Sequence, residues 1–562
     1  MRSLRPIPRA TSAAGWAAGL SCVVLVVLLL SGCSGSRLDK SWRAPRLVVV
    51  IVVDQMRIDY LSRYADQYSG GLARLNREGI AFTDAHHDHA LTYTAPGHAS
   101  LSTGVYPRKH GIVSNFWWTH DRRRTIYAVE DTVRVLGAPD VPGSSPSLLL
   151  REPLGSWLKR VHPESNVFSV SLKDRAAILM AGPDADAAYW LAEGRFVTSE
   201  WYLEAYPEWV TAFNEAALSQ SSWPAAWDRL HPEASYGASR EDDFPAEADG
   251  VRTTFPHLFE EEASAPAYHS GPWESPFGDE RALAFARTLI AEEGLGDDAT
   301  PDLLMISASA ADVIGHAYGP YSQEVQDYYL RLDRMLQSFF ETLDTTIGPD
   351  AYLVALTSDH GVLPMPEELQ RRGVASKRID PIHIAKTAVE AARRRLGLSD
   401  LPASVGEDIV LRFPGGFMSD SSLAVIRQAI AAELLRREEV ADVFTHEELV
   451  DRRTRRRPFL EQYRRSYHPE RSPDILIRYK EHYLPVASPT GTSHGGPYAY
   501  DTHIPMVFLS HAFRAARHAR QVAAVDLAPT LATLMRIEAP DDLDGAVLRE
   551  VIRATRLDPR LP

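Results

Sequence analysis

One stretch near the N-terminus constrains the fold more than any other. Residues 47–53 read Leu-Val-Val-Val-Ile-Val-Val and are followed directly by Asp54. A β-branched run without polar alternation predicts a strand that is covered on both faces, as in a parallel sheet between two layers of helices. Ligands of open α/β sheets bind beyond the carboxyl ends of the strands. Asp54 is therefore a candidate site residue, with a turn or helix N-cap role as the structural alternative.

The same pattern recurs three times along the chain. Apolar runs at 166–172, 301–307 and 351–357 are followed by charged or imidazole side chains: Lys173, Asp174 and Arg175; Asp312 and His316; Asp359 and His360. Further strands are expected at 473–478 and 504–509, and helices at 59–77, 382–396, 422–437 and from Asp526. These segments predict an α/β fold, with a central, mostly parallel sheet between helices and one edge that collects the polar groups.

The remaining segments suggest a domain plan. A catalytic domain over 46–540 would contain two cap-like insertions, at about 183–280, which is rich in tryptophan, proline and acids, and at about 366–485. Residues 541–562 are expected to form a C-terminal tail. The net charge of −14 argues against a protein that binds the nucleic-acid backbone.

The first residues are typical of a bacterial export signal. Three arginines precede an apolar run from about Trp16 to Leu30, which is short for a membrane span. The run ends in Leu-Ser-Gly-Cys33, which resembles a lipobox and predicts a signal peptide over 1–32, lipidation of Cys33 and a tether over 33–45; a simple signal peptide or short anchor is the alternative. The protein would be periplasmic or anchored to the outer membrane through its lipid.

A hydroxyl with a possible catalytic role follows the first polar loop. Thr94 lies in Thr-Tyr-Thr-Ala-Pro-Gly-His-Ala-Ser (92–100), before small residues that suggest the start of a helix. Free backbone N–H groups and the positive end of a helix dipole favour anions there. Thr94 is a candidate nucleophile toward an anionic substrate, and a simple helix N-cap is the alternative.

Metal ligands are expected from nitrogen and oxygen side chains alone. Asp312 and His316 are four residues apart, so one helical turn would present both to the same ion. Nitrogen and oxygen donors without thiolates suit zinc, with manganese or iron as alternatives. Two metals about 4 Å apart can stabilise both the attacking and the leaving oxygen of an in-line displacement. The candidate ligands are Asp54, Asp312, His316, Asp359, His360 and His494.

In order and spacing these residues resemble the alkaline phosphatase superfamily, including its nucleotide pyrophosphatase/phosphodiesterase branch. The matching motifs are Val-Asp-Gln-Met-Arg (53–57), Thr-Ala-Pro-Gly-His (94–98) and Ser-Asp-His-Gly (358–361). The resemblance implies two zinc ions, one held by Asp312, His316 and His494 and the other by Asp54, Asp359 and His360. It also implies that Thr94 bridges toward the second ion as nucleophile and passes through a phospho-threonine.

Three further residues help to predict which branch of the superfamily the chain resembles. Asn115, Lys173 and Arg175 are similar to the set that single-domain, threonine-nucleophile alkaline phosphatases use to bind phosphate. A cationic clamp favours the dianionic phosphoryl group of a monoester, so a monoesterase is expected. The alternatives are a phosphodiesterase or pyrophosphatase with the same metals, and, from another class, a metal-lined binding protein or envelope phospho-group transferase. Lys173 and Arg175 could also be a surface ion pair.

Other motifs are expected to have structural roles. The His-His-Asp-His run (86–89) is interpreted as a loop bordering the site, and direct ligation as its alternative. His98 and His110 are expected to form structural hydrogen bonds, and Trp117 and Trp118 to pack. The arginine-rich run 452–457 is expected to be a solvated face, with an anion-binding patch as the alternative.

Overall fold

A mixed ten-stranded sheet forms the centre of the protein in a computed structural model that describes residues 42–119, 124–218, 224–259, 272–406, 408–411 and 419–555. Its order is β19-β2-β18-β11-β1-β10-β5-β6-β7, with β20 beside β2. The strands from β11 to β6 are parallel, while β18 runs antiparallel to both β11 and β2. The strands are β1 (Leu47–Val53), β2 (Ile80–His86), β5 (Val167–Ser171), β6 (Ala187–Ala192), β7 (Arg195–Val197), β10 (Asp302–Ala308), β11 (Tyr352–Thr357), β18 (His503–Leu509), β19 (Ala516–His518) and β20 (Val522–Ala523).

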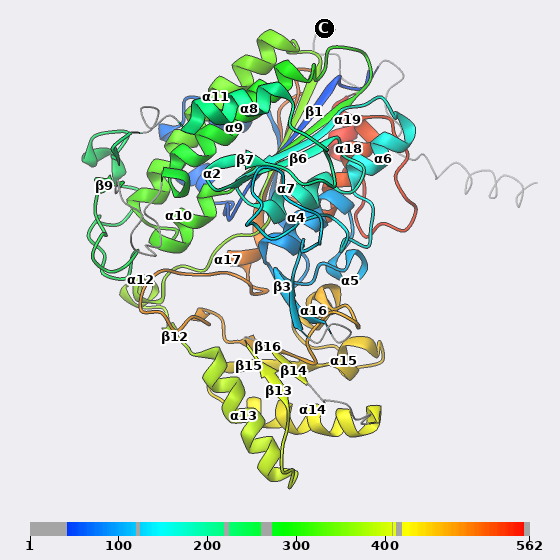
Figure 1. Ribbon diagram of the computed structural model, residues 1–562. Coiled ribbons are helices and arrows are strands. Elements are labelled where there is room, and N and C mark those ends of the chain that lie inside the picture. The colour runs from blue at the N-terminus through cyan, green and yellow to red at the C-terminus, as the bar shows by residue number, and fades with distance from the viewer. Residues whose placement is uncertain are drawn as a thin grey trace, which may run out of the picture.

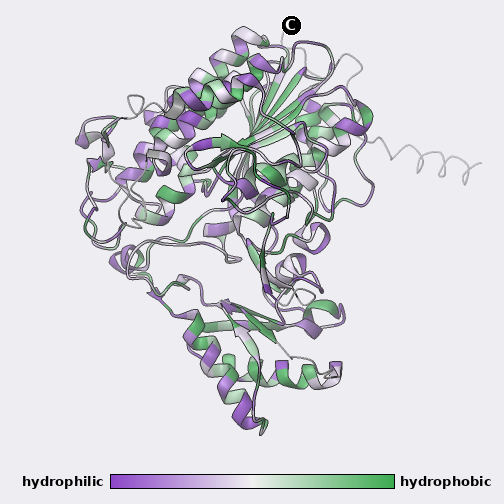
Figure 2. Ribbon diagram, viewed as in Figure 1, coloured by the Kyte–Doolittle hydropathy of each residue, from purple (hydrophilic) through white to green (hydrophobic). Residues whose placement is uncertain are grey.

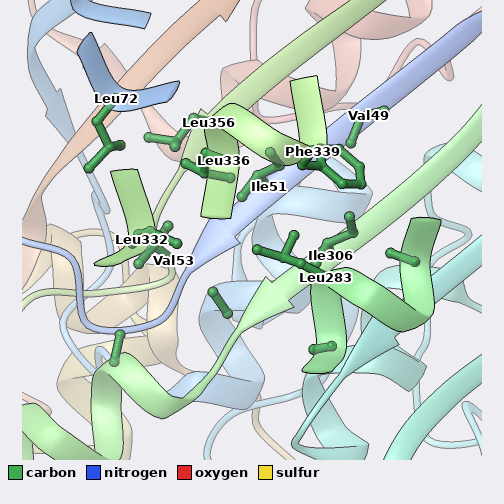
Figure 3. Close-up of a cluster of buried hydrophobic side chains, with 14 of the residues drawn as sticks. Val49, Ile51, Val53, Leu72, Leu283, Ile306, Leu332, Leu336, Phe339 and Leu356 are labelled. Atoms are coloured by element: carbon green, nitrogen blue, oxygen red, sulfur yellow. The ribbon is translucent and has the colours of Figure 1, made fainter. Parts of the chain in front are cut away.

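β1 lies in the middle of this sheet and is buried on both faces, as its uninterrupted apolar run predicts. Val49, Ile51 and Val53 point toward Leu332, Leu336 and Phe339 of α11 (Figure 3). Val48, Val50 and Val52 pack on the other face, against α6 and α18. Strands that are apolar throughout require such two-sided cover, and the predicted α/β fold is confirmed.

Helices cover the two faces as separate layers (Figure 1), and the strands are the most apolar part of the body (Figure 2). One layer contains α3 (Gly71–Glu78), α9 (Pro276–Glu292), α10 (Ala310–Tyr318) and α11 (Gln323–Thr346). The other contains α4 (Thr94–Thr103), α6 (Leu154–Val161), α7 (Asp174–Ala181), α18 (Leu527–Leu534) and α19 (Arg549–Ala554). Shorter or peripheral helices are α2 (Tyr60–Arg63), α5 (Pro107–His110), α8 (Glu208–Leu218), α12 (Pro366–Arg371) and α17 (Ala499–Thr502).

The helix expected over 59–77 is wrong as a single element. The structure has α2, a short 3-10 turn at Ala65–Gln67 and then α3, separated by an extended residue, Tyr68. The carboxylate of Asp333 on α11 accepts hydrogen bonds from the backbone N–H groups of Ser69, Gly70, Leu72 and Ala73. This distant acceptor satisfies the free donors at the start of α3, so the chain begins a second helix there.

Part of the region 183–280, which is predicted as a cap-like insertion, belongs to the main sheet. β6 and β7 extend the main sheet at one edge, and the buried Tyr189, Trp190 and Phe196 explain their place in it. The rest of this region that the structure describes includes α8 and a short antiparallel pair of strands, β8 (Ala226–Trp227) and β9 (His257–Leu258).

Residues 379–483 build a smaller unit that lies below the main body in Figure 1. A four-stranded sheet, β13-β14-β16-β15, packs on two helices and encloses its own apolar core. Its elements are α13 (Pro381–Arg395), β13 (Ala403–Val405), β14 (Ile409–Leu411), α14 (Asp420–Leu434), β15 (Val440–Thr445), α15 (His446–Val450), α16 (Leu460–Ser466) and β16 (Ile475–Tyr479). The strand expected at 473–478 therefore belongs to this unit and not to the main sheet.

The structure contradicts the predicted C-terminal tail and does not test the predictions for the N-terminus. Residues 541–555 are not a free tail, because Leu548, Val551 and Ile552 are buried in the core beside α18. Cys33, the predicted signal peptide and most of the tether lie outside the described residues. Within the described ranges, every helix is too short or too polar to cross a membrane.

Candidate active site

The predicted site residues meet at the carboxyl edge of the central sheet. Each comes from a different element: Asp54 follows β1, Asp312 and His316 lie on α10 after β10, and Asp359 and His360 follow β11. Thr94 begins α4, Lys173 and Arg175 lie at the start of α7, Asn115 precedes β3 (Phe116–Thr119), and His494 lies in the loop before α17. Parallel strands bring these ends together, which explains how residues far apart in sequence form one site.

The possible metal ligands form two groups that share His360. In Asp54, Asp359 and His360, one ligand atom from each residue lies within 4.8 Å of the others, and the same is true of Asp312, His360 and His494. His316 joins the second group, because its Nε2 lies 3.2 Å from Oδ1 of Asp312 and its ring centre lies 5.0 Å from that of His494. The six predicted ligands are thus together, while the rings of His360 and His494 stack at 3.5 Å.

All three imidazoles are oriented by the backbone. Nδ1 lies 2.7 Å from the Thr492 carbonyl oxygen in His316, 2.7 Å from that of Thr92 in His494, and 3.0 Å from that of Gly361 in His360. A proton on each Nδ1 leaves Nε2 with its lone pair toward the carboxylates. Histidines that bind metals are held in this way in proteins generally.

Each of the two carboxylates in the first group has a buried oxygen that a bound cation would satisfy. Oδ1 of Asp54 and Oδ2 of Asp359 are buried without hydrogen-bond partners among the described residues. Burial, followed by the neighbouring carboxylates, raises the pKa of Asp359 well above its usual range, and burial raises that of Asp54 despite Lys173. Buried carboxylate oxygens of this kind are destabilising unless a cation or a hydrogen-bond donor satisfies them, and Lys173 contacts only the other oxygen of Asp54. The donor set therefore fits divalent metal ions.

Thr94 is buried, at 1% exposure, at the first position of α4. Its Oγ1 lies 3.5 Å from Nε2 of His360 and 3.5 Å from Nη2 of Arg175. The N-cap is Tyr93, so Thr94 is not the cap that the alternative interpretation required. α4 lies close to the turn that follows β11. A Cβ on Gly97 of α4 would lie only 2.4 Å from the carbonyl oxygen of Asp359 in that turn. The hydroxyl therefore faces the ligands at a helix N-terminus, a position that favours an anion.

Lys173, Arg175 and Asn115 lie near the start of α4 or beside the metal groups, each with its own contacts. Arg175 contacts the Thr94 hydroxyl. Lys173 Nζ lies 2.6 Å from both Asp54 Oδ2 and Asp312 Oδ2, and so links the two metal groups. The Nε of Arg175 is buried without a hydrogen-bond partner among the described residues. Asn115 Oδ1 accepts a hydrogen bond of 2.9 Å from the Ala95 backbone N–H, which leaves its amide nitrogen for other groups. One cation thus contacts the hydroxyl, a second lies between the two metal groups, and an amide side chain contacts the residue that follows Thr94.

Three supporting residues were not anticipated from the sequence. Gln55 has a φ of 67°, and its side chain donates to Asp312 while its backbone N–H donates to Asp359 Oδ1. Asp501 accepts from the backbone N–H groups of Gly495 and Gly496, beside His494. Tyr127 lies between Asp174 and Arg175, at 2.5 and 3.3 Å. Gln55 lies inside a motif that was noted, but its contacts depend on tertiary structure.

The other noted histidines lie around the site. His87 contacts the Ser358 carbonyl oxygen at 3.0 Å, beside Asp359, and His89 is fully buried. His98 contacts the Thr94 carbonyl oxygen and Ser307 Oγ, and His110 contacts Ser100 Oγ, so both make structural hydrogen bonds. Trp117 is buried, as packing requires.

The arginine-rich run 452–457 remains mainly solvent-exposed, although Arg457 is partly buried and lies 2.9 Å from Glu448. The face is thus solvated, as expected.

Comparison with known proteins gives the same family along the whole described body. Residues 48–503 match the family model of type I phosphodiesterase / nucleotide pyrophosphatase. The chain is 32% identical to alkaline phosphatase PafA of Elizabethkingia meningoseptica, over 94% of this chain and 98% of the relative. It is 31% identical to alkaline phosphatase PhoV of Synechococcus elongatus, over 95% of this chain and 99% of that one. The crystal structure of wild-type PafA aligns with a TM-score of 0.84 and 31% identity, covering 92% of this chain and all of PafA.

Proposed function

Because the chain belongs to the type I phosphodiesterase/nucleotide pyrophosphatase family of the alkaline phosphatase superfamily, we propose that it is a metal-dependent phosphatase that hydrolyses phosphate monoesters. The observation that carries the proposal is that the Thr94 hydroxyl, in contact with Arg175, lies beside two groups of metal ligands. Lys173 links these groups, and Asn115 contacts the next residue of α4. Its relatives PafA and PhoV are named alkaline phosphatases.

The six ligands would hold two zinc ions. Asp54, Asp359 and His360 would bind one, and Asp312, His316 and His494 the other. Bound divalent ions supply Lewis-acid activation of a hydroxyl or water and stabilise the charge that develops on the leaving oxygen. Metal analysis of the purified protein, with and without substitution of His316 or Asp359, tests the number and identity of the ions.

Thr94 would act as the nucleophile. Its oxygen attacks phosphorus, the ester oxygen leaves, and a phospho-threonine forms; water then attacks phosphorus, releases inorganic phosphate and restores the hydroxyl. Arg175 would bind two phosphoryl oxygens through its fork of N–H groups, and the free backbone N–H groups of α4 would contribute to their binding. Lys173 adds a positive charge next to the same group.

A monoester suits this clamp better than a diester. Its phosphoryl group carries one more negative charge, and positioned cations discriminate by charge in a site shielded from water. The test is a comparison of kcat/KM for p-nitrophenyl phosphate and its bis ester with zinc-loaded protein. A large preference for the monoester supports the proposal, while a large preference for the diester would favour the phosphodiesterase alternative that the family name also contains.

We further propose that the enzyme is exported and anchored by a lipid on Cys33, from the sequence of residues 1–33. Metabolic labelling with a radioactive fatty acid tests this, since Cys33→Ala should abolish the label and Cys22→Ala, within the segment removed, should have no effect on the mature product. Label that persists in Cys33→Ala would contradict the anchor.

A further inference from the structure

A second histidine-containing group lies at the same sheet, outside the catalytic ligands. Asp84 and His86 belong to β2, and His503 begins β18. One ligand atom from each lies within 4.8 Å of the other two. In the sheet order β2 is separated from β1 by β18 and β11, so the group is carried by different strands from Asp54 and Asp312.

The register of the two strands produces this group. His503 lies directly opposite His86, and their rings stack with centres 4.5 Å apart. Asp84 is two residues before His86, and alternation places residues two apart on one face of a strand. A register shift lies between Ile504 and Met506, so β2 has an extra residue there. Such bulges re-aim side chains and are common next to functional sites.

The ring nitrogens are arranged as metal-binding imidazoles require. His86 Nε2 lies 2.8 Å from Asp84 Oδ1, while its Nδ1 lies 3.4 Å from the Thr502 hydroxyl. His503 Nε2 lies 3.0 Å from the Thr83 carbonyl oxygen, and a proton on that nitrogen leaves the lone pair on Nδ1. Each ring therefore has one nitrogen held by the protein and the other able to bind an ion.

The group is accessible but not fully exposed. The side chain of His86 is 17% exposed and that of Asp84 is 42% exposed, so an ion from solvent can reach both. Two imidazoles and a carboxylate with open positions suit divalent transition metals better than calcium or magnesium, which prefer oxygen ligands alone.

We propose that Asp84, His86 and His503 bind one divalent transition-metal ion, in addition to the catalytic ions. The ion would join β2 to β18 at the site edge of the sheet. His87 follows directly and contacts the Ser358 carbonyl oxygen, so the joined strands would support the turn that carries Asp359. This additional site does not depend on the identity of the substrate.

Calorimetric titration with Zn²⁺ of protein that holds two zinc ions per chain tests the proposal, because the catalytic ligands are then occupied while the additional site is still empty. Wild type should bind one further equivalent. Loss of an outer hydrogen-bonding partner weakens metal sites by about 10–100-fold, so loss of a ligand in His86→Ala or His503→Gln should weaken this binding by at least about 100-fold. His511→Ala is the matched control: His511 is an exposed histidine paired with Asp350 at 2.6 Å, and the control should keep the equivalent.

Two results would overturn the proposal: no further equivalent in wild type, or unchanged binding in His86→Ala and His503→Gln. Melting temperatures before the titration show whether each variant is folded. If a histidine variant unfolds, Asp84→Asn takes its place, because it alters a partly exposed ligand with little change in size. Asp84→Asn should weaken the binding of the further ion, and full affinity in this variant would also count against the site. Thr94→Ala should still bind the extra ion, which separates this test from the catalytic proposal.

Discussion

Replacement of Arg175 by alanine tests how the enzyme selects its substrate. The Arg175 side chain is partly buried, with Nη2 3.5 Å from the Thr94 hydroxyl and a buried Nε that lacks a partner among the described residues. If it donates two hydrogen bonds to a phosphoryl group, their loss removes about 3 kcal/mol of transition-state stabilisation, at about 1.5 kcal/mol for each bond to a charged group. That corresponds to a decrease of about 100-fold in monoester kcat/KM.

A diester should lose less from the same change. Its second ester group replaces one of the charged oxygens, so one of the two hydrogen bonds is missing and the loss is about 1.5 kcal/mol, or roughly tenfold. The ratio of monoester to diester activity should therefore fall by about tenfold in Arg175→Ala. Arg175→Lys, with one point charge in place of the fork, should lie between wild type and alanine.

The assay is kcat/KM for p-nitrophenyl phosphate and its bis ester, measured with the same zinc-loaded preparations. Arg124→Ala is the control, because the side chain of Arg124 is exposed and pairs with Glu130. It should leave both rates unchanged. Equal losses on both esters in Arg175→Ala, with the fold intact by melting temperature, would refute the charge-based clamp.

Three other changes follow from named contacts. Gly97→Ala places a Cβ 2.4 Å from the Asp359 carbonyl oxygen and should lower the free energy of unfolding in urea by about 1–3 kcal/mol. Gly237→Ala is the control, because Gly237 has open space around it and the change should not destabilise the protein. Equal urea midpoints for the two variants would contradict the close approach at Gly97. Tyr127→Phe removes the hydroxyl that lies between Asp174 and Arg175. Loss of this hydrogen bond, at about 1 kcal/mol, should lower monoester kcat/KM by about five- to tenfold. An unchanged kcat/KM would show that the Tyr127 hydroxyl does not position Arg175. Burial lowers the pKa of His110 to about 3, and its Nδ1 accepts from the Ile112 N–H. As the pH falls below about 6.5, the unfolded chain therefore binds a proton on this histidine while the folded protein does not. The free energy of unfolding then decreases, by about 2 kcal/mol at pH 5. Urea unfolding at pH 7 and pH 5 should show this loss in wild type and a smaller one in His110→Gln; equal losses would remove His110 as the cause.

Much of the central sheet follows from local sequence, because a buried parallel strand is mostly apolar. β1 is apolar throughout, and β5, β10 and β11 are mostly apolar; the polar residues after these strands mark the edge where the site forms. β6 and β7 were not anticipated, since short strands with tyrosine and tryptophan in a loop-rich region do not differ locally from irregular packing. Their place at the sheet edge depends on tertiary contacts.

The sequence predicts which residues form the site better than it predicts how they are arranged in space. Spacing and family resemblance named six ligands, yet the position of His360 within reach of both groups depends on how β11 meets the His494 loop. The support from Gln55 requires a left-handed backbone and a contact with α10. Likewise, Asp333 caps α3 from a helix more than 250 residues away, which no local helix signal contains.

The central claim is that Thr94 becomes phosphorylated during turnover. Zinc-loaded enzyme should be mixed with excess monoester, quenched in acid within one turnover and digested for mass spectrometry. The account predicts one added phosphoryl group on the peptide that contains Thr94, absent from Thr94→Ala, which should also lose activity while keeping its metal content. A phosphoryl group on another residue, or full activity in Thr94→Ala, would contradict it.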